Sequence, residues 1–511
     1  MPESPISIAQ YFHERTKYHP ETIASKSQQL DWEKQPVPFK EYKIGTSFDL
    51  KPYIREASEP LSDDSKVQVA QRLSHLLLHS YGLTAKLQTM QGFHFLRSSP
   101  SAGGLYPAEV YLISRGTPFL PPGLYNYQPQ THSLLQFWDS QVWPELQAAC
   151  FSHPALENTS LAICITAVFY RSAWRYQDRA YRRIFLDTGH LLGNLELACS
   201  LNHYRPHLIG GFADDALNQM MYLDSTQEGA VTVVAIADLF DSPEIPSTLT
   251  ALPSSTQTDY PELTDGELLG YFHNATKLDV SIGENQNWIQ NPINQEVEDK
   301  YNFPFCTKVS TVTTPINWGK NCQELDQTIL KRRSTRSYNG IDLKLEELLA
   351  LLDFTYQSHH YIAQSLNGYP DYFDLSLIET FLAISGVSGL EEGCYYYAPF
   401  AQELRQIRFK NFRRELHFLC LGQELGRDAS VVLFHTADLK KAVAKYGDRA
   451  YRYLHMDAGH LGQRLNLAAI YQRLGVSGIG GFFDDKVNEV LGIPTDEAVI
   501  YITTLGRPQS N

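Results

Sequence analysis

The chain contains two diverged copies of one segment, and this internal repeat constrains its fold more than any other feature. The forty residues from Tyr176 match the forty from Tyr446 without a gap, at a constant offset of 270, and about half of the positions are identical. The same offset superimposes GLYNYQP, from Gly123, on GCYYYAP, from Gly393. A repeat of this length predicts two domains of one fold rather than one larger core.

The repeat sets the domain boundaries that we expect. Copy one covers residues 1–240 and copy two covers residues 262–511 of the 511-residue chain. The intervening residues 241–261 are rich in Pro, Ser and Thr, which is typical of a linker. Such a duplication is typical of an ancestral homodimer fused into one chain, so we expect an intrachain pseudo-dimer. It needs no partner chain, and a monomer is the default, although a higher oligomer stays open.

Helix and strand patterns alternate within each copy. Residues 449–475 have apolar residues at helical spacing and end on a glycine, which predicts a long helix with a glycine C-cap at Gly475. Residues 108–113, 431–436 and 498–506 are short and rich in β-branched residues, which predicts strands. We therefore expect an α+β fold with a mixed or antiparallel sheet flanked by helices, occurring twice.

Composition excludes several classes of partner and site. The net charge is −14, from 57 acidic and 43 basic residues, which argues against nucleic acid or an anionic membrane as partner. The seven cysteines are scattered without a C-x-x-C pair, so we expect neither a metal site nor a redox pair. No run of 18 apolar residues and no signal-like start is present, which predicts a cytoplasmic protein.

A basic segment in copy two is the first candidate binding site. Arg332, Arg333, Ser334 and Arg336 precede an amphipathic helical pattern, and their guanidinium and hydroxyl donors suit a phosphate group. A solvated basic patch before a helix is the alternative explanation of this run.

Two glycine-rich segments are the other candidates. Ser101, Ala102, Gly103 and Gly104 lie before a strand, where small residues let the backbone approach a planar ligand. A plain tight turn explains this segment equally well. Gly480 and Gly481 follow the long helix of copy two, and their lack of side chains again permits close backbone approach. Arg507, near the C-terminus, is a further candidate phosphate ligand.

Together these segments resemble the flavin-dependent nitroreductase superfamily. SPSAGGLYPAEVYLI followed by GLYNYQP, and the DAGH helix with FFDD beyond it, are similar to the SagB/ThcOx-type dehydrogenases, which oxidise azolines in ribosomal peptides. The resemblance covers most of both copies. It implies a flavin mononucleotide (FMN) at a dimer interface, with phosphate ligands mainly from one subunit and a loop over the ring from the other.

The two copies have lost complementary parts of this site. Copy one has PLSDDSK where copy two has RRSTR, and Asp238 and Leu239 where copy two has Gly506 and Arg507. Copy two has Phe373 and Asp374 in place of the paired glycines of copy one. We therefore expect one FMN per chain. Its phosphate and ribityl end would contact Arg332, Arg333, Ser334, Arg336 and Arg507, and its ring would lie among Ser101, Ala102, Gly103, Gly104, Gly480 and Gly481.

The resemblance also implies a catalytic pair. In azoline-oxidising relatives a Lys-Tyr pair takes part in proton transfer, which here corresponds to Lys445 and Tyr446, where copy one has Arg175 and Tyr176. A surface lysine beside a tyrosine at a helix start is the alternative. The DTGH and DAGH elements occur in both copies, which favours a structural role over a metal site.

Three functions follow from these observations. The first is oxidation of azoline rings in a modified peptide by an FMN-dependent dehydrogenase. The second is a general nitroreductase or quinone reductase that takes hydride from NAD(P)H and acts on a small molecule. The third is a non-catalytic flavoprotein or peptide-binding pseudoenzyme, because each copy has lost half of a site.

Overall fold

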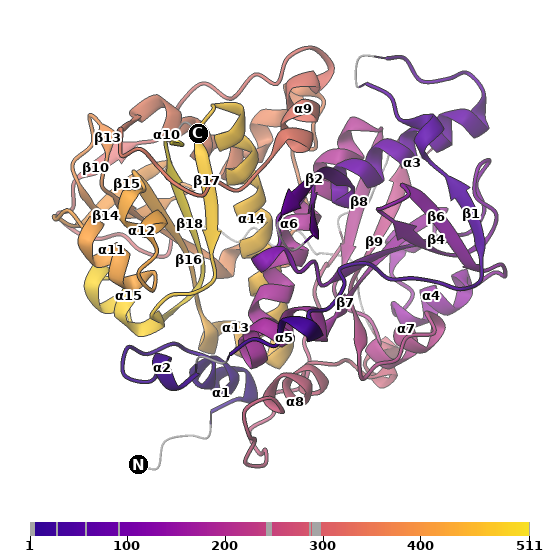
Figure 1. Ribbon diagram of the computed structural model, residues 1–511, viewed down its shortest axis with the longest axis horizontal. Coiled ribbons are helices and arrows are strands. Elements are labelled where there is room, and N and C mark those ends of the chain that lie inside the picture. Colours follow the sequence, from indigo (N-terminus) through magenta and orange to yellow (C-terminus); the bar gives the residue numbers. More distant parts are fainter. Residues whose placement is uncertain are drawn as a thin grey trace.

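Two domains, each a sheet flanked by helices, lie side by side in the computed structural model (Figure 1). It describes residues 6–26, 29–56, 59–89, 92–241, 248–285, 288 and 298–509. The predicted α+β class with two related domains is confirmed. Among the helices described, none combines the length and apolarity needed to cross a membrane.

Short 3₁₀ turns aside, copy one contains helices α1 (Ile8–Arg15), α2 (Ile23–Lys26), α3 (Ser65–Tyr81), α4 (Trp143–Ala149), α5 (Phe169–Tyr176), α6 (Ala180–Leu201) and α7 (Asp214–Met220), with strands β1 (Thr46–Asp49), β2 (Leu83–Thr89), β3 (Gly92–Arg97), β4 (Ala108–Ser114), β5 (Gly123–Gln128), β6 (Ser133–Trp138), β7 (Leu161–Val168), β8 (Tyr204–Ile209) and β9 (Glu228–Asp238). Copy two contains α8 (Leu268–Ala275), α9 (Gln323–Lys331), α10 (Leu345–Tyr356), α11 (Arg413–Leu419), α12 (Glu424–Asp428), α13 (Leu439–Tyr446), α14 (Ala450–Tyr471) and α15 (Asp484–Leu491), with β10 (Lys308–Ser310), β11 (Leu343–Lys344), β12 (Glu379–Ile384), β13 (Val387–Ser388), β14 (Gly393–Ala398), β15 (Glu403–Arg408), β16 (Val431–Asp438), β17 (Gly475–Ile479) and β18 (Glu497–Gly506).

The two large sheets have the same topology. Copy one forms the order β1-β6-β5-β4-β7-β9-β8, and copy two forms β10-β15-β14-β12-β16-β18-β17, which matches it strand for strand. Every strand pair within these two sheets is antiparallel. The three predicted strands are confirmed as β4, β16 and β18.

The predicted end of the long helix in copy two is wrong. Helix α14 ends at Tyr471, and Gly475 begins β17 instead of capping the helix. Arg473 adopts a left-handed φ of 58°, which turns the chain, and Gly475 then pairs with Gly506 on β18. Gly475 therefore belongs to β17, because it pairs with β18, and this pairing is not visible in the local pattern that predicts a helix cap.

The two longest helices, α6 and α14, cross at the centre of the molecule (Figure 1). Gly189 and Gly459 lie at the crossing, where a Cβ on Gly189 would be 2.1 Å from the carbonyl oxygen of Met456 and one on Gly459 would be 2.2 Å from that of Leu186. A larger residue would force the helices apart. These glycines belong to the DTGH and DAGH elements, so a packing role explains why both copies carry them.

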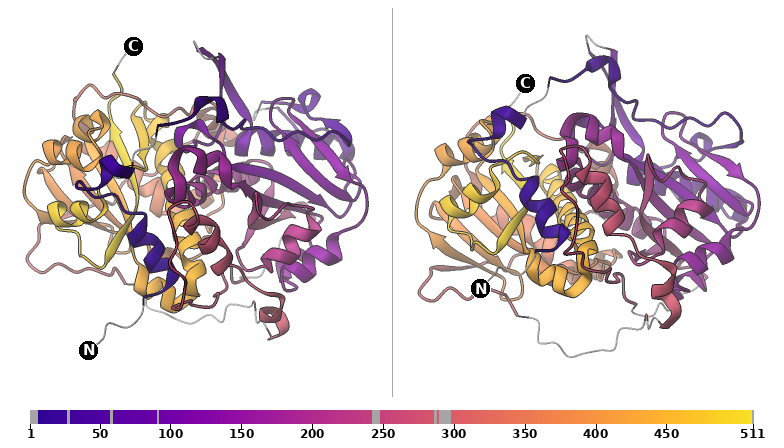
Figure 2. Two further views of the ribbon diagram at one scale, coloured as in Figure 1. Left: turned by 60° about the horizontal axis from the view of Figure 1, so that its bottom comes forward. Right: turned by 90° about the horizontal axis from the view of Figure 1, so that it is seen from below.

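Each copy extends its N-terminal segment over the other. Helix α1 of copy one lies against the helices of copy two (Figure 2), and Tyr18 beyond it bridges to Phe483. In the matching exchange, Leu278 of copy two bridges to Ala213 of copy one. The copies are therefore interlocked and not merely in contact.

A buried carboxylate anchors each exchange. Asp484 of copy two accepts hydrogen bonds from Arg179 and Arg182 of copy one, at 2.9 and 2.7 Å. At the offset of 270, Asp214 of copy one accepts them from Arg449 and Arg452 of copy two, at 2.7 and 2.8 Å. Burial disfavours the charge of both carboxylates, but the two guanidinium groups on each outweigh it and lower the pKa.

Candidate functional site

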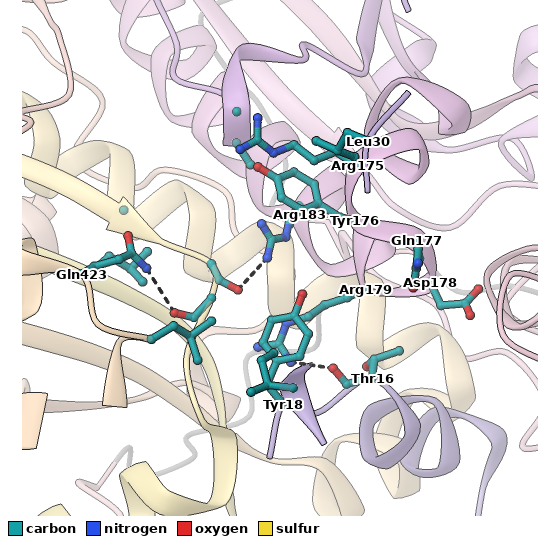
Figure 3. A pocket seen from close by; sticks show the side chains of 18 of the residues that line it. Thr16, Tyr18, Leu30, Arg175, Tyr176, Gln177, Asp178, Arg179, Arg183 and Gln423 are labelled. Atoms are coloured by element: carbon teal, nitrogen blue, oxygen red, sulfur yellow. Dashed lines mark hydrogen bonds between the residues drawn. The ribbon is translucent and has the colours of Figure 1, made fainter. Parts of the chain in front are cut away.

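Two adjoining cavities lie between the copies on one side of the molecule. Their volumes are about 590 and 150 Å³. Both are lined by residues of copy one and of copy two, and Figure 3 views the larger one. The residues common to both cavities are Ala102, Gly103 and Arg183 of copy one and Arg336, Gly478 and Gly480 of copy two.

The loop of copy one forms one wall of these cavities. Asp187 on α6 accepts hydrogen bonds from Ser101 Oγ, at 2.6 Å, and from the backbone N–H of Ala102, at 3.1 Å. Burial raises the pKa of Asp187 to about 7, although these hydrogen bonds oppose the shift. Gly103 has a φ of 66°, and a Cβ there would lie 2.8 Å from the hydroxyl of Tyr176. The predicted Ser101, Ala102 and Gly103 thus line the site.

The remaining predicted loop residue does not line either cavity. Gly104 faces His94, whose ring would lie 2.8 Å from a Cβ on Gly104. Its role in the structure is to let the loop pass close to the β2–β3 hairpin.

The glycine loop of copy two forms the opposite wall. Gly480 lines both cavities and Gly481 lines the larger one. The carbonyl of Gly480 accepts a hydrogen bond from Arg183 at 3.0 Å (Figure 3). Gly478 precedes them, and a Cβ there would collide with the hydroxyl of Tyr501. The backbone of this loop is therefore exposed to the cavity without intervening side chains.

The basic segment of copy two divides into two roles. Ser334 and Arg336 line the smaller cavity. Arg332 instead donates to the backbone carbonyls of Ser98 and Arg97 of copy one, at 2.6 and 3.1 Å, and Arg333 donates to that of Thr84 at 2.9 Å. Arg332 and Arg333 therefore hold the two copies together, whereas Ser334 and Arg336 line the cavity.

Arg507 is not among the lining residues. Its Nη2 donates to both carboxylate oxygens of Glu347 on α10, at 3.0 and 2.8 Å. The strand register matches Arg507 with Asp238 and Gly506 with Ala237, one position away from the match that the sequence suggests. Asp238 in turn pairs with Arg72 on α3. The same strand-to-helix ion pair thus occurs in both copies with its charges exchanged.

Lys445 and Tyr446 lie away from both cavities. Lys445 Nζ and the Tyr446 hydroxyl both contact Asp374 Oδ2, at 2.5 and 3.1 Å. The residues at the same positions of copy one, Arg175 and Tyr176, line the large cavity instead. Lys445 and Tyr446 have the expected residue types, but Arg175 and Tyr176 are the pair that lies at the open site.

Side chains fill the matching region on the other side of the pseudo-dimer. Phe373 stacks on Tyr453 with ring centroids 4.9 Å apart, and it would lie 2.6 Å from a Cβ on Gly210, the counterpart of Gly480. Leu252 of the linker packs at 2.5 Å from the Cβ position of Gly211. The linker and the bulky loop of copy two therefore close this second site.

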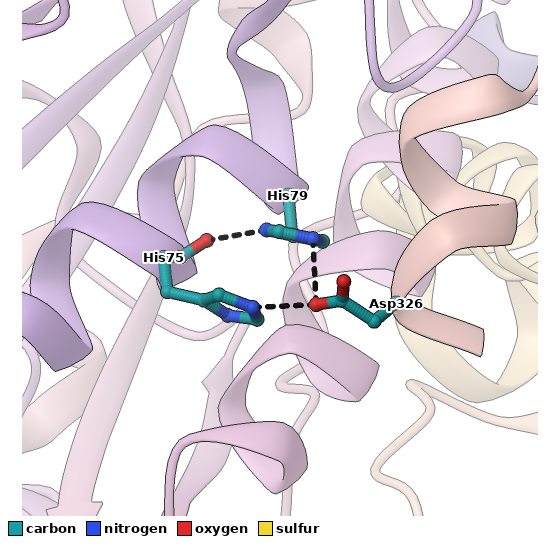
Figure 4. Close-up of side chains that lie close together, drawn as sticks. All are labelled: His75, His79 and Asp326. Atoms are coloured by element: carbon teal, nitrogen blue, oxygen red, sulfur yellow. Dashed lines mark hydrogen bonds and ion pairs between the residues drawn. The ribbon is translucent and has the colours of Figure 1, made fainter. Parts of the chain in front are cut away.

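A buried group of three side chains joins the copies elsewhere (Figure 4). His75 and His79 on α3 have the H-x-x-x-H spacing that could signal a metal site, and Asp326 on α9 faces both. His75 accepts from the Asn202 amide at 2.8 Å and donates from Nε2 to Asp326 at 2.5 Å. Because both ring nitrogens of His75 are engaged, hydrogen bonding between α3 and α9 explains this group.

Comparison with known proteins assigns the family. The Nitroreductase family model matches residues 67–237 and 329–507, one match in each copy. The chain belongs to the nitroreductase family. The crystal structure of a nitroreductase-family protein from Anabaena variabilis is 66% identical and covers 99% of this chain and 100% of its own, with a TM-score of 0.93.

Two curated relatives match parts of this nitroreductase-family chain. A nitroreductase-family protein of Methanocaldococcus jannaschii is 31% identical over 189 residues, which cover 36% of this chain and 91% of the relative. The microcin B17-processing protein McbC of Escherichia coli is 26% identical over 152 residues, which cover 28% of this chain and 55% of McbC.

Proposed function

We propose that this nitroreductase-family chain is an FMN-dependent oxidoreductase that binds one FMN per chain between its two copies. The observation that supports this most directly is the asymmetry of the pseudo-dimer. One interface site is an open cavity with walls from both copies, and its counterpart is filled by Phe373 and Leu252. A flavin has room in the first and none in the second.

The residues of the open site fit FMN. Arg336 and Ser334 offer the charged and hydroxyl donors that a phosphate or ribityl chain needs. Arg332, two residues before Ser334 in the chain, has a buried Nη1 with no hydrogen-bond partner among the described residues. Gly103 and Gly480 leave opposite walls free for a planar ring.

Bound FMN would supply two-electron redox chemistry, and the chain would position its partners. The Tyr176 hydroxyl lies beside Gly103, where it can hydrogen-bond a substrate. Arg175 cannot serve as a base, because a guanidinium stays protonated. We therefore favour reduction of a small-molecule acceptor with NAD(P)H as reductant. Azoline oxidation in a modified peptide is the second candidate, and the likeness to McbC favours it.

Flavin loading tests this proposal. We expect the full chain, reconstituted and desalted, to bind one FMN per chain by its absorbance near 450 nm, and NADPH or NADH to bleach that band without oxygen. Two FMN per chain would contradict the closed second site, and no FMN would contradict the proposal as a whole. Bound FMN that only an azoline peptide reduces would establish the second candidate instead.

The hydrogen bonds that tether the copy-one loop to Asp187 give a second prediction. We expect Asp187→Asn to weaken FMN binding about tenfold at pH 8, because an amide oxygen replaces a carboxylate that accepts two hydrogen bonds. In the unsubstituted chain Asp187 becomes ionised as the pH rises through about 7, so FMN affinity should rise over that range. The Asp187→Asn variant should not show this rise.

The other copy supplies the control for that experiment. Asp457 accepts from the backbone N–H groups of Phe373 and Asp374 at the closed site, and burial raises its pKa to about 7 as well. Asp457→Asn should leave FMN affinity unchanged. Equal losses in the two variants, measured by fluorescence titration, would mean that the loop tether does not act on the flavin.

A further inference from the structure

Arginines dominate the lining of the large cavity. Among its described lining residues are five arginines and two acidic residues. The acidic groups are already engaged, because Asp265 pairs with Arg15 and Asp178 accepts from two backbone N–H groups. The cavity therefore has an excess of positive charge. The arginines are Arg15, Arg175, Arg179, Arg183 and Arg336.

Arg179 is buried but incompletely hydrogen-bonded. Its side chain is 3% exposed, and Nη1 donates to Asp484 at 2.9 Å and to the carbonyl of Thr16 at 2.6 Å. Nε and Nη2 have no partner among the described residues. The ring of Tyr18 covers the guanidinium, with its centroid 4.2 Å away (Figure 3). Two buried charged donors are thus left without an acceptor, which is costly unless a ligand supplies one.

The second copy offers an internal comparison. Arg449 lies at the position that matches Arg179, and all three of its nitrogens donate, to Asp214, Thr276, Gly210 and Tyr453. The closed site therefore satisfies the arginine that the open site does not. Incomplete hydrogen bonding is a property of the open cavity and not of the fold.

Arg183 adds a second charge that the closed site lacks. Its Nη2 donates to the Gly480 carbonyl at 3.0 Å, its Nε is buried without a partner, and the Tyr176 ring centroid is 3.5 Å from its guanidinium. Arg183 interacts electrostatically with Asp187, but that carboxylate already accepts a hydrogen bond from Ser101 of the copy-one loop. The matching residue of copy two is the neutral Tyr453.

We propose that the large cavity binds an organic anion, a carboxylate or phosphate group on a planar molecule, through Arg179 and Arg183, with the exposed Arg175 at its edge. Charge-assisted hydrogen bonds to such an oxyanion would supply the missing acceptors, and Tyr18 and Tyr176 offer flat walls. The proposal names the substrate class of the proposed enzyme and so rests on the proposed function. The anion could belong to the acceptor, as a carboxylate, or to the reductant, as the extra phosphate of NADPH.

Calorimetric titration of the FMN-loaded full chain tests the anion site. We expect benzoate and phenyl phosphate to bind at least tenfold more tightly than the neutral benzamide at low salt, and added NaCl to reduce this difference. A preference for NADPH over NADH in binding, without a preference for benzoate, would assign the anion to the reductant. Equal binding of benzoate, phenyl phosphate and benzamide, with NADPH and NADH also equal, would overturn the proposal.

Three variants locate the site. Arg183→Gln should weaken the binding of the preferred anion at least tenfold, and Arg175→Gln about threefold. Lys445→Gln, the matched change at the closed site, should leave it within twofold. Arg175 and Lys445 are both exposed, so their variants stay informative even if Arg183→Gln fails to fold. Equal effects of Arg175→Gln and Lys445→Gln would overturn the assignment to this cavity.

The same titrations without FMN separate the two proposals. Anion binding by flavin-free chain with no FMN binding would contradict the proposed function and retain the anion site. FMN binding with no preference for an anion would retain the proposed function and contradict the anion site.

Discussion

Reversing the charge of Arg336 is expected to weaken FMN binding at least a hundredfold. Arg336 lines both cavities, and the described structure gives it no hydrogen bond or ion pair to another residue. A flavin phosphate or ring oxygen would therefore be its partner, and Arg336→Glu would replace that attraction with repulsion. In a partly screened cleft the change amounts to about 3 kcal/mol or more, which corresponds to about a hundredfold in the dissociation constant.

A charge reversal at the closed site controls for net charge. Lys445→Glu changes the chain by the same two charge units, and Lys445 pairs with Asp374 away from both cavities. Its FMN affinity should stay within twofold of the unsubstituted chain. Fluorescence titration of both variants measures the difference. Comparable losses in the two would mean that the flavin responds to overall charge and that Arg336 is not a ligand.

Neutralising either buried interface aspartate is expected to destabilise the chain strongly. Asp484→Asn removes the charge that faces Arg179 and Arg182, and Asp214→Asn does the same for Arg449 and Arg452. Breaking a buried ion pair from one side costs about 3–5 kcal/mol, because charged groups stay buried without compensation. In domains of this size that lowers Tm on the order of 10 °C, measurable by calorimetry.

The pH dependence of this loss has a definite sign. Asp214 and Asp484 have a lowered pKa in the folded chain. Their charges therefore stabilise the folded chain fully above the pKa of an unfolded aspartate, about 4, and this stabilisation is lost as the pH falls through the folded pKa. The gap in Tm between the unsubstituted chain and each variant should therefore narrow below about pH 4.

Adjacent exposed aspartates serve as matched controls. Asp485 and Asp215 follow the buried residues directly, and their side chains are 58% and 78% exposed in ion pairs with Lys17 and Lys277. Asp485→Asn and Asp215→Asn should change stability by about 1 kcal/mol at most, because surface ion pairs contribute little. Similar losses in buried and exposed variants would contradict the interlocking role of Asp214 and Asp484.

The sequence alone determined the duplication, the α+β class and the strands, because the repeat is visible in the order of residues and the β-branched pattern is a local signal. It also selected Ser101, Ala102, Gly103, Ser334, Arg336, Gly480 and Gly481, which the structure brings to one pair of cavities. The basic segment of copy two and the glycine loop of copy one stand out because the two copies differ there, whereas Gly480 and Gly481 have glycine counterparts in copy one.

Only the tertiary structure decided which charged side chains face the open site. Lys445 and Tyr446 have the expected residue types, but they lie against Asp374, whereas Arg175 and Tyr176 face the cavity. Arg507 is a residue type that binds phosphate, yet in the structure it forms an ion pair with Glu347. The physical reason is that a charged side chain takes the partner that packing brings within reach, and a one-dimensional pattern does not record which elements from distant parts of the chain meet.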